Sequence, residues 1–392
     1  MISKNLYVAY SGGVDSHVLL HLVANSFDNV SAIHINHALS SEDDCMQQHC
    51  ERVCAALNIS LQCITVDAKP KGTQSPEDAA RQARRSAWLA TLSKNDILLL
   101  AHHAQDQAET ILYRLFRGAG PKGLGGMSQS SLLGAVQILR PLLEVSKQKI
   151  LAYAQQHNLN YIEDSTNANL NFDRNFIRQQ VLPLIEQRWP QACNNINRAG
   201  LLLKQQLQCL EPQLQVYLQQ CSAQADQLSI LKLQAIPNQW QNQVLRTWLQ
   251  QHGTTPSCRQ LQQIQQEVMA AREDANPIFA FKNFKVRRSN DILFIVFDTA
   301  ESTENFSCQW DLLQQPELQL PTGAVLKASD MQFATTKLEV RLGQHGVKAK
   351  KIFQAYAIPP WERAKYPLLV LDGRLIAIVG LWVNPRVLTT SC

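Results

Sequence analysis

Two features are missing from this 392-residue sequence: a C-x-x-C pair and a long hydrophobic run. Its ten cysteines are scattered, so we expect free thiols, with no disulfide framework and no structural zinc. No apolar stretch approaches the roughly 20 residues that span a bilayer. The first residues lack the basic, apolar and small-residue regions of a secretory signal. We therefore expect a soluble, cytoplasmic protein that has no membrane partner.

A third absence concerns the first glycine-rich turn, which lacks the lysine of a Walker phosphate-binding loop. Residues 5–22 read NLYVAYSGGVDSHVLLHL: an apolar strand pattern, a turn with two glycines and an apolar helix pattern. Gly12 and Gly13 let backbone N–H groups approach an anion, and the following helix N-terminus favours phosphate. Asp15 beside phosphates makes sense chiefly through Mg²⁺. The turn predicts a nucleotide site, with a strand, turn and helix that bind no ligand as the alternative.

Apolar β-type segments alternate with helix-length segments through the first half of the chain. The predicted strands are 6–10, 30–35, 61–66 and 97–101. This alternation is typical of a parallel sheet covered by helices, in which ligands bind beyond the carboxyl ends of the strands. Polar candidates follow three of these strands: Ser11 to Ser16, then Asn36 and His37, then His102, His103 and Asp106.

The composition changes along the chain in a way that predicts three domains. We predict an α/β nucleotide-binding domain over 1–194, a mostly helical domain with a terminal hairpin over 195–299, and a small α/β or α+β domain over 316–392, after a polar connector. Residues 341–365 carry six Lys and Arg against one Glu, a local excess equal to the net charge of +5. This basic segment predicts a polyanionic partner, with a solvated basic surface as the alternative.

The SGGVDS turn, Ser11 to Ser16, resembles the SGGxDS loop of the PP-loop ATP pyrophosphatases. Further motifs follow in the order seen in the tRNA(Ile)-lysidine synthetases and extend into the central and C-terminal parts of that family. They are INHAL (35–39), AARQAR (79–84), AHHAQDQAETIL (101–112), RGAGPKGLGGM (117–127), RPLL (140–143), IEDSTNANLNFDRNFIR (162–178), LPLIEQRWP (182–190), AREDANP (271–277) and KAKKIFQAYAIPPWERAKYPLLV (348–370).

The resemblance implies a two-step reaction on tRNA(Ile) with a CAU anticodon. ATP adenylates the C2 oxygen of the wobble cytidine, and the side-chain amine of free L-lysine then displaces AMP to form lysidine, which changes the codon read from AUG to AUA. ATP and Mg²⁺ are the implied cofactors, and no obligate protein partner is evident. Attack at the α-phosphate also accounts for the missing lysine, because the β- and γ-phosphates leave together as pyrophosphate.

The resemblance and the spacing together give three sets of candidate site residues. The ATP-binding set, in which Asp15 is also catalytic and the metal ligand, is Ser11, Gly12, Gly13, Val14, Asp15, Ser16, Asn36, His37 and His102. The other catalytic candidates are Arg81, Asp106, Glu109 and Arg178. The tRNA-contact candidates are Arg84, Arg117, Lys122, Arg174, Asn175, Lys348, Lys350 and Lys351.

Several of these candidates have a structural alternative. Asp106 and Glu109 lie three residues apart and share a helix face, where they either bind a substrate ammonium or Mg²⁺ or complement the helix dipole. Arg81 and Arg84 either clamp phosphates or form a solvated basic face. The glycine-rich segment 117–127 is predicted to close over the substrate. Trp361 is predicted to be a packing residue.

Two other functions compete with lysidine synthesis. A tRNA thiolation enzyme with the same loop would need reactive or cluster-binding cysteines near the cleft, and the absence of a C-x-x-C pair argues against it. A non-catalytic RNA-binding protein of the same fold would not need an intact SGGVDS turn with Asp15.

Overall fold

The computed structural model describes residues 5–37, 41–70, 72, 75–163, 169–272, 275–297, 305–330, 337–343 and 345–384. The chain divides into two compact units, Met1–Leu210 and Glu211–Cys392. Among the described residues, no helix is both long enough and apolar enough to cross a membrane.

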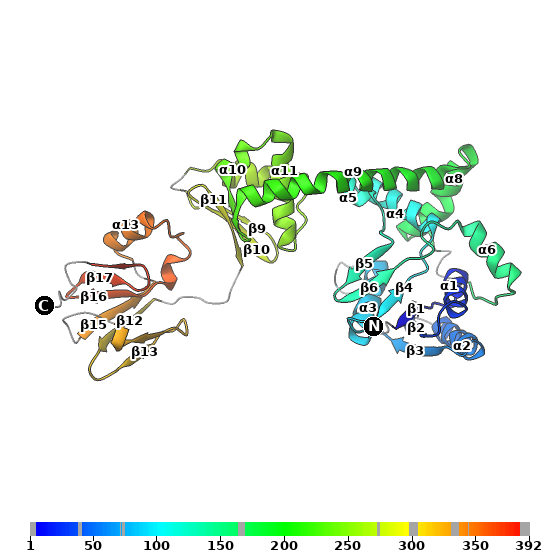
Figure 1. The fold of residues 1–392 in the computed structure, drawn as a ribbon, viewed down its shortest axis with the longest axis horizontal. Coiled ribbons are helices and arrows are strands. Elements are labelled where there is room, and N and C mark those ends of the chain that lie inside the picture. Colours follow the sequence, from blue (N-terminus) through cyan, green and yellow to red (C-terminus); the bar gives the residue numbers. More distant parts are fainter. Residues whose placement is uncertain are drawn as a thin grey trace. The chain divides into compact units, whose positions relative to one another are not determined.

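A six-stranded sheet of order β3-β2-β1-β4-β6-β5 forms the centre of the first unit (Figure 1). Its strands are β1 (Leu6–Ala9), β2 (Val30–Asn36), β3 (Ser60–Thr65), β4 (Ile97–Leu99), β5 (Ser130–Leu133) and β6 (Val136–Leu139). All neighbours pair in parallel except β5 and β6. The four strands predicted from the sequence are confirmed. The strand order changes direction between β1 and β4, and ligands bind outside the carboxyl ends of strands at such a point.

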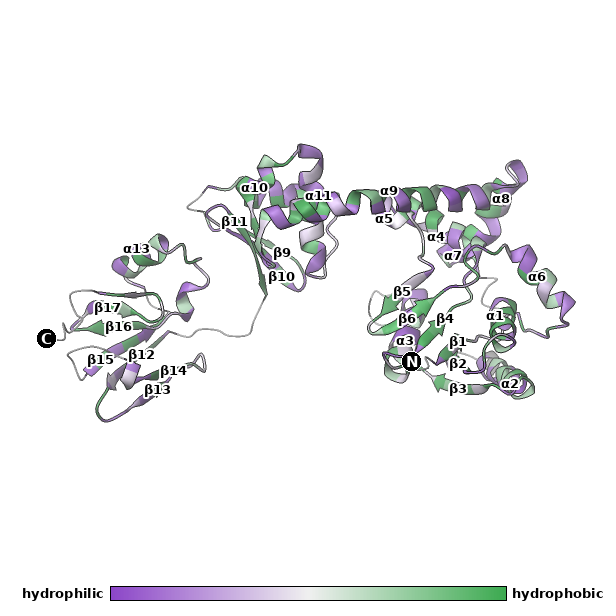
Figure 2. Ribbon diagram, in the orientation of Figure 1, coloured by the Kyte–Doolittle hydropathy of each residue, from purple (hydrophilic) through white to green (hydrophobic). Residues whose placement is uncertain are grey.

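Helices cover both faces of this sheet. One face carries α1 (Val14–Ala24), α2 (Ser41–Ala56) and α6 (Lys147–Gln156), and the other carries α3 (Pro76–Thr91). Alternation along the strands explains the two layers, because Val8 and Tyr10 pack with the first set of helices, whereas Ile33 packs with Trp88 of α3. Figure 2 accordingly shows green, hydrophobic strands between helices of mixed colour.

The remaining helices of the first unit gather around α4. They are α4 (Ala104–Phe116), α5 (Pro121–Leu124), α7 (Asp173–Phe176), the π-helical segment η2 (Ile177–Val181), α8 (Leu182–Arg188) and α9 (Ala192–Cys221), which continues past Leu210 into the second unit. Ala108 and Leu112 of α4 form a small core with Ile177 and Leu182. On α9, the Asn197 side chain donates a 2.8 Å hydrogen bond to the Ala104 carbonyl. Helix α9 therefore fixes the first turn of α4.

The second unit begins with a five-stranded antiparallel sheet and a helical layer. The sheet contains β7 (Ser222–Gln224), β8 (Gln227–Ser229), β11 (Ile292–Phe297), β10 (Phe284–Ser289) and β9 (Ile278–Ala280), and the helices are α10 (Ile230–Ala235), α11 (Asn238–Gln251), α12 (Cys258–Gln263) and η3 (Ile264–Met269). The predicted hairpin is confirmed by β10 and β11. The region predicted as mostly helical also contains the short strands β7 and β8, because the fully buried Leu228 pairs with β11.

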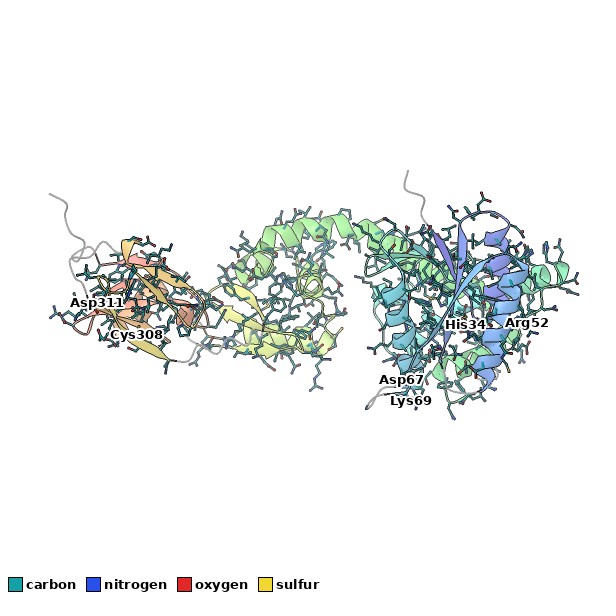
Figure 3. The ribbon with its side chains drawn as sticks, turned by 90° about the horizontal axis from the view of Figure 1, so that it is seen from below. His34, Arg52, Asp67, Lys69, Cys308 and Asp311 are labelled. Atoms are coloured by element: carbon teal, nitrogen blue, oxygen red, sulfur yellow. The ribbon has the colours of Figure 1, made fainter. Side chains whose placement is uncertain are left out.

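A second antiparallel sheet, of order β12-β15-β16-β17-β18, follows. Its strands are β12 (Phe306–Asp311), β15 (Lys337–Leu342), β16 (Leu368–Leu371), β17 (Arg374–Ile378) and β18 (Trp382–Val383). The same region contains a separate hairpin of β13 (Glu317–Gln319) and β14 (Val325–Lys327). It also contains the helix α13 (Val347–Ala355) and the 3-10 turns η4 (Ala328–Asp330) and η5 (Arg363–Lys365). Strand β12, on which Cys308 and Asp311 are labelled in Figure 3, lies in the predicted polar connector. Trp310 explains the difference, because it is fully buried in the core of this sheet.

Trp361 packs between two residues of the β10–β11 hairpin. Its ring lies edge-on to Phe294, with 5.3 Å between ring centroids, and the Arg287 guanidinium carbon lies 4.9 Å from its centroid. Arg287 and Phe294 are themselves a cross-strand pair. The predicted packing role of Trp361 is confirmed.

Close packing at Gly200 of α9 generates a stability prediction. A Cβ there would lie 2.8 Å from Ile111 Cδ1 and 2.9 Å from the Leu124 carbonyl oxygen. Alanine is the better helix former by about 1 kcal/mol, but overpacking costs about 1–3 kcal/mol. Gly200→Ala should therefore lower the urea midpoint, whereas exposed Gln206→Ala on the same helix should not. A raised midpoint for Gly200→Ala would show that the contact is loose.

Candidate active site

The SGGVDS turn connects β1 to α1 at the carboxyl edge of the sheet. Gly12 has φ +87°, and a Cβ there would lie 3.0 Å from Met46 Sδ, so this position requires glycine. The Ser16 hydroxyl donates to the Gly13 carbonyl at 2.9 Å and accepts from the Ser11 N–H at 3.2 Å. These bonds hold the turn closed at the start of α1. Gly13, the N-cap, has no side chain to occupy the first-turn N–H groups, which suits an anion.

This turn opens into a cleft of about 1320 Å³. That volume exceeds the roughly 300–1,000 Å³ of a typical small-molecule pocket. The predicted residues that line it are Ser11, Gly13, Val14, Asp15, Ser16, His37, Arg81, Arg84, His102, Asp106, Arg174 and Arg178. Of the other first-unit candidates, all within the described chain, Gly12, Asn36, Glu109, Arg117, Lys122 and Asn175 are outside the lining.

The side chains of Asn36 and Asn175 are hydrogen-bonded to other parts of the protein and do not line the cleft. The buried Asn36 amide on β2 donates to Asp44 Oδ1 at 3.3 Å and to Gln47 Oε1 at 3.0 Å, both on α2. The Asn175 amide donates to the Asn169 carbonyl at 3.0 Å. His34, labelled in Figure 3, is buried on β2 with Nδ1 3.0 Å from the Tyr10 carbonyl oxygen. Of the two polar residues predicted at this strand end, His37 lines the cleft and Asn36 does not.

Asp15 is held by Lys147, which the sequence analysis did not name, and by His103, which it named only as a polar candidate after a strand. The Lys147 ammonium at the start of α6 donates to Asp15 Oδ1 at 2.6 Å. His103 Nε2 lies 3.6 Å from the same oxygen and 3.5 Å from Asp106 Oδ2. His103 Nδ1 accepts the Gln105 N–H at 3.2 Å, so a neutral ring carries its proton on Nε2, facing both carboxylates. Burial lowers the pKa of His103, and the two aspartates oppose that shift.

Asp106, Glu109 and Arg178 form one connected network. Arg178 Nε and Nη2 donate to the two Glu109 oxygens at 2.7 and 2.8 Å, and Nη2 also donates to Asp106 Oδ1 at 3.0 Å. Asp106 Oδ2 accepts the His103 N–H at 2.9 Å and so caps α4. Glu109 is only 2% exposed, and burial raises its pKa while Arg178 opposes the rise. The two carboxylates thus share a helix face as predicted, but only Asp106 reaches the cleft lining.

His102 lines the cleft as a neutral imidazole. Burial lowers its pKa to about 4, with Asp106 opposing that shift and nearby arginines adding to it. Its buried Nδ1 has no hydrogen-bond partner among the described residues. His102 therefore supplies a polar, uncharged wall at neutral pH and no charge for binding phosphate.

Guanidinium groups crowd the rest of the cleft wall. Besides Arg178, the lining arginines are Arg81, Arg84, Arg85, Arg114, Arg140 and Arg174. Burial lowers the pKa of Arg114 and Arg140, and repulsion from Arg81 lowers both further. Glu77 pairs with Arg174 at 3.3 Å. Positive groups held this close repel one another, so the wall is complementary to a polyanion.

The glycine-rich segment 117–127 is held against α4. The Gln107 side-chain amide donates to the Met127 carbonyl at 2.9 Å and accepts the Met127 N–H at 2.7 Å. Arg114 Nη1 donates to the Gly123 and Gly126 carbonyls, each at 2.9 Å. These bonds fix the segment in the described conformation, and the predicted closure over substrate stays a prediction.

The basic segment near the C-terminus contains both paired and exposed cations. Arg341 donates to both Glu339 oxygens at 2.7 and 2.6 Å, and Lys365 pairs with Glu362 at 3.0 Å. Lys348, Lys350 and Lys351 are exposed on α13, where no carboxylate of the described chain forms an ion pair with them. The Lys348 ammonium lies 5.2 Å from the Trp382 ring centroid. The exposed lysines of this segment without a carboxylate partner in the described chain are therefore on α13, while the half-buried Arg363 donates to the Ile358 carbonyl at 3.0 Å.

A divalent cation fits this site only if the protein and the substrate share its coordination. Within the described ranges, no group of three or more His, Cys, Asp or Glu side chains is arranged to hold a metal. Asp15 nevertheless presents a carboxylate to the cleft within the SGGVDS turn. Mg²⁺ is commonly bound by one or two carboxylates with substrate phosphates and water, and this donor set matches that pattern.

The sequence matches three domain families. Residues 2–185 match the PP-loop domain, 228–294 the TilS substrate binding domain, and 334–392 the TilS substrate C-terminal domain. Three similar proteins are named tRNA(Ile)-lysidine synthase. That of Coxiella burnetii is 35% identical over 96% of this chain and 89% of its own length. That of Serratia proteamaculans is 37% identical over 97% of this chain and 92% of its own length. That of Escherichia coli O157:H7 is 34% identical over 98% of this chain and 94% of its own length.

The Arg178–Glu109 pair generates a pH-dependent stability prediction. Arg178→Met leaves Glu109 buried without a counter-charge and should lower stability at pH 8 by about 3–5 kcal/mol. Without Arg178, the pKa of Glu109 rises further above the unfolded value of about 4.3. A carboxyl whose folded pKa is raised stabilises the fold when protonated, and this contribution is lost as pH rises. The deficit should therefore shrink at pH 5.

Urea unfolding at both pH values tests this prediction. The double variant Arg178→Met with Glu109→Gln is the control, since it removes the titrating group and should show a pH-independent deficit. An equal deficit at pH 5 and pH 8 in the single variant would contradict the assigned burial of Glu109.

Proposed function

The chain belongs to the tRNA(Ile)-lysidine synthase family, and on that premise we propose that it joins L-lysine to C2 of the wobble cytidine in tRNA(Ile) with a CAU anticodon. It is an ATP-dependent, tRNA-modifying ligase. The observation that carries the finer proposal is that the SGGVDS turn and the Asp106–Arg178 pair line the same cleft. One end suits the phosphates of ATP, and the other suits an amino acid with both charges.

In the first half-reaction, the cytidine C2 oxygen attacks the α-phosphorus of ATP and pyrophosphate leaves. The N–H groups at the start of α1 would bind the leaving phosphates. Asp15 would hold Mg²⁺, which neutralises phosphate charge when bound. Lys147, 2.6 Å from Asp15, brings from α6 the positive charge that the glycine turn lacks. His102, neutral at pH 7, borders the nucleotide without adding charge.

In the second half-reaction, the lysine side-chain amine attacks C2, the C2–O bond breaks and AMP leaves. Asp106 would bind an ammonium group of lysine, because its carboxylate lines the cleft and its position is fixed by His103. Arg178 would face the lysine carboxylate, and Glu109 positions Arg178 from behind through two hydrogen bonds. In this proposal Asp106 and Arg178 contact lysine, and Glu109 acts through Arg178.

The thiolation alternative requires a cysteine where the chemistry occurs. No described cysteine lines the cleft. Burial raises the pKa of Cys50, which lies beneath the glycine turn near Gly12, and so disfavours the reactive thiolate. Ligation of an amine therefore fits the residues better than transfer of sulfur.

The lysine-site proposal predicts that the two half-reactions separate. Asp106→Asn should leave adenylation of tRNA within a few-fold of the unchanged protein and slow lysine transfer at least tenfold, because it removes the charge that binds the ammonium. Glu109→Gln should raise the KM for lysine less than Asp106→Asn does, since the Arg178 guanidinium and the Asp106 carboxylate both remain.

The measurement is single-turnover trapping of labelled AMP on tRNA, scored beside incorporation of labelled lysine. Matched ATP-binding data for both variants serve as the control. Equal loss of both steps in Asp106→Asn would indicate a metal ligand and overturn the lysine assignment.

We further propose that α13 binds the tRNA backbone through Lys348, Lys350 and Lys351, whose charges are exposed. Changing all three to alanine should weaken tRNA binding and flatten its salt dependence. With fewer phosphate contacts, binding releases fewer counterions from the tRNA. ATP binding should stay unchanged. Lys365→Ala is the matched control, since Lys365 is paired with Glu362. Identical salt slopes for the triple variant and the unchanged protein would favour a solvated surface.

A further inference from the structure

A second, smaller pocket of about 340 Å³ lies beside the cleft and has no role in the two half-reactions described above. Four arginines line it. Arg81, Arg114 and Arg174 line both cavities, whereas Arg117 lines only the side pocket. The shared residues make the side pocket continuous with the wall of the cleft.

The side pocket concentrates positive charge. The pKa of Arg114 is lowered mainly by burial and further by repulsion from Arg174 and Arg81. One carboxylate, that of Glu77, pairs with Arg174 from the rim at 3.3 Å. Guanidinium groups bind phosphate oxygens in a bidentate manner, and four of them around a small space are complementary to an anion with several oxygens.

The arginines are also held in place before any ligand arrives. Arg114 Nη1 is fixed by the Gly123 and Gly126 carbonyls. Arg117 Nη1 donates to the Tyr113 hydroxyl at 2.6 Å, and its guanidinium carbon lies 5.2 Å from the Tyr113 ring centroid. Side chains ordered in advance lose little entropy on binding, which is a property of a binding site.

We propose that the side pocket binds one backbone phosphodiester of the tRNA anticodon loop, next to the nucleotide whose base enters the cleft. The proposal rests on the function proposed above. The phosphates of ATP belong at the SGGVDS turn, which is outside the lining of the side pocket. A polynucleotide with its base in the cleft can instead place a neighbouring phosphate across Arg81 and Arg174, because these residues border both cavities. This contact would set which nucleotide is presented for adenylation.

Arg117 is the residue to change, since it is exposed and lines only the side pocket. In the full-length protein, Arg117→Gln should weaken binding of an anticodon stem-loop about 5- to 10-fold and reduce the salt slope by about 0.7, the value for one single-strand phosphate. The KM for ATP should not change. Tyr113→Phe, which keeps the ring and removes the hydroxyl, should have a smaller effect.

A coupling experiment locates the phosphate. Stem-loops with one neutral methylphosphonate at each position around the wobble nucleotide are tested against both proteins. At one position the substitution should weaken binding to the unchanged protein yet have no further effect in Arg117→Gln. Effects that multiply at every position would overturn the proposal, and inhibition by inorganic phosphate equal to that by the stem-loop would assign the pocket to free anions. Failure of the proposed function would differ, because the unchanged protein would then not adenylate the stem-loop.

Discussion

The pairing of Arg178 with Glu109 and Asp106 is the interaction on which the site depends. Glu109 is buried, and a buried carboxylate without a counter-charge is costly, so Arg178 is required where it lies. Because Arg178 belongs to η2 and the carboxylates belong to α4, the pair fixes two segments far apart in the sequence. Asp106 then extends the network through His103 to Asp15, which Lys147 holds from α6. This network sets the distance between the SGGVDS turn and the Asp106–Arg178 pair, to which we assign the phosphates and lysine.

The distribution of charge around this network matches the proposed substrates. Asp15 and Asp106, which we assign to a metal ion and a cationic amino acid, line the same cleft as the arginines that suit phosphates. His102 lines this cleft without adding charge. A site for ATP alone would not need a second arginine-lined pocket, whereas a site that also receives an RNA strand does.

Strand ends were predictable from the sequence, and partners across the chain were not. The SGGVDS turn, His37, His102 and Asp106 follow apolar strand patterns, and the parallel sheet brings them to one edge. Lys147 was missed because it is 132 residues from Asp15, and no local pattern indicates that contact. Asn36 also follows a strand, but its amide faces α2. Strand β12 was missed although Phe306, Cys308 and Trp310 alternate with polar residues, because the polar residues around this short segment favoured a connector.

The central claim is that this protein activates the tRNA and not the amino acid. The most direct test incubates the purified protein with tRNA(Ile) bearing CAU and ATP labelled at the α-phosphate, without lysine, followed by a lysine chase. The account predicts that label appears on the tRNA, that lysine discharges it as AMP, and that a tRNA with uridine at the wobble position is not labelled. Label on lysine, or none on the tRNA before the chase, would contradict it.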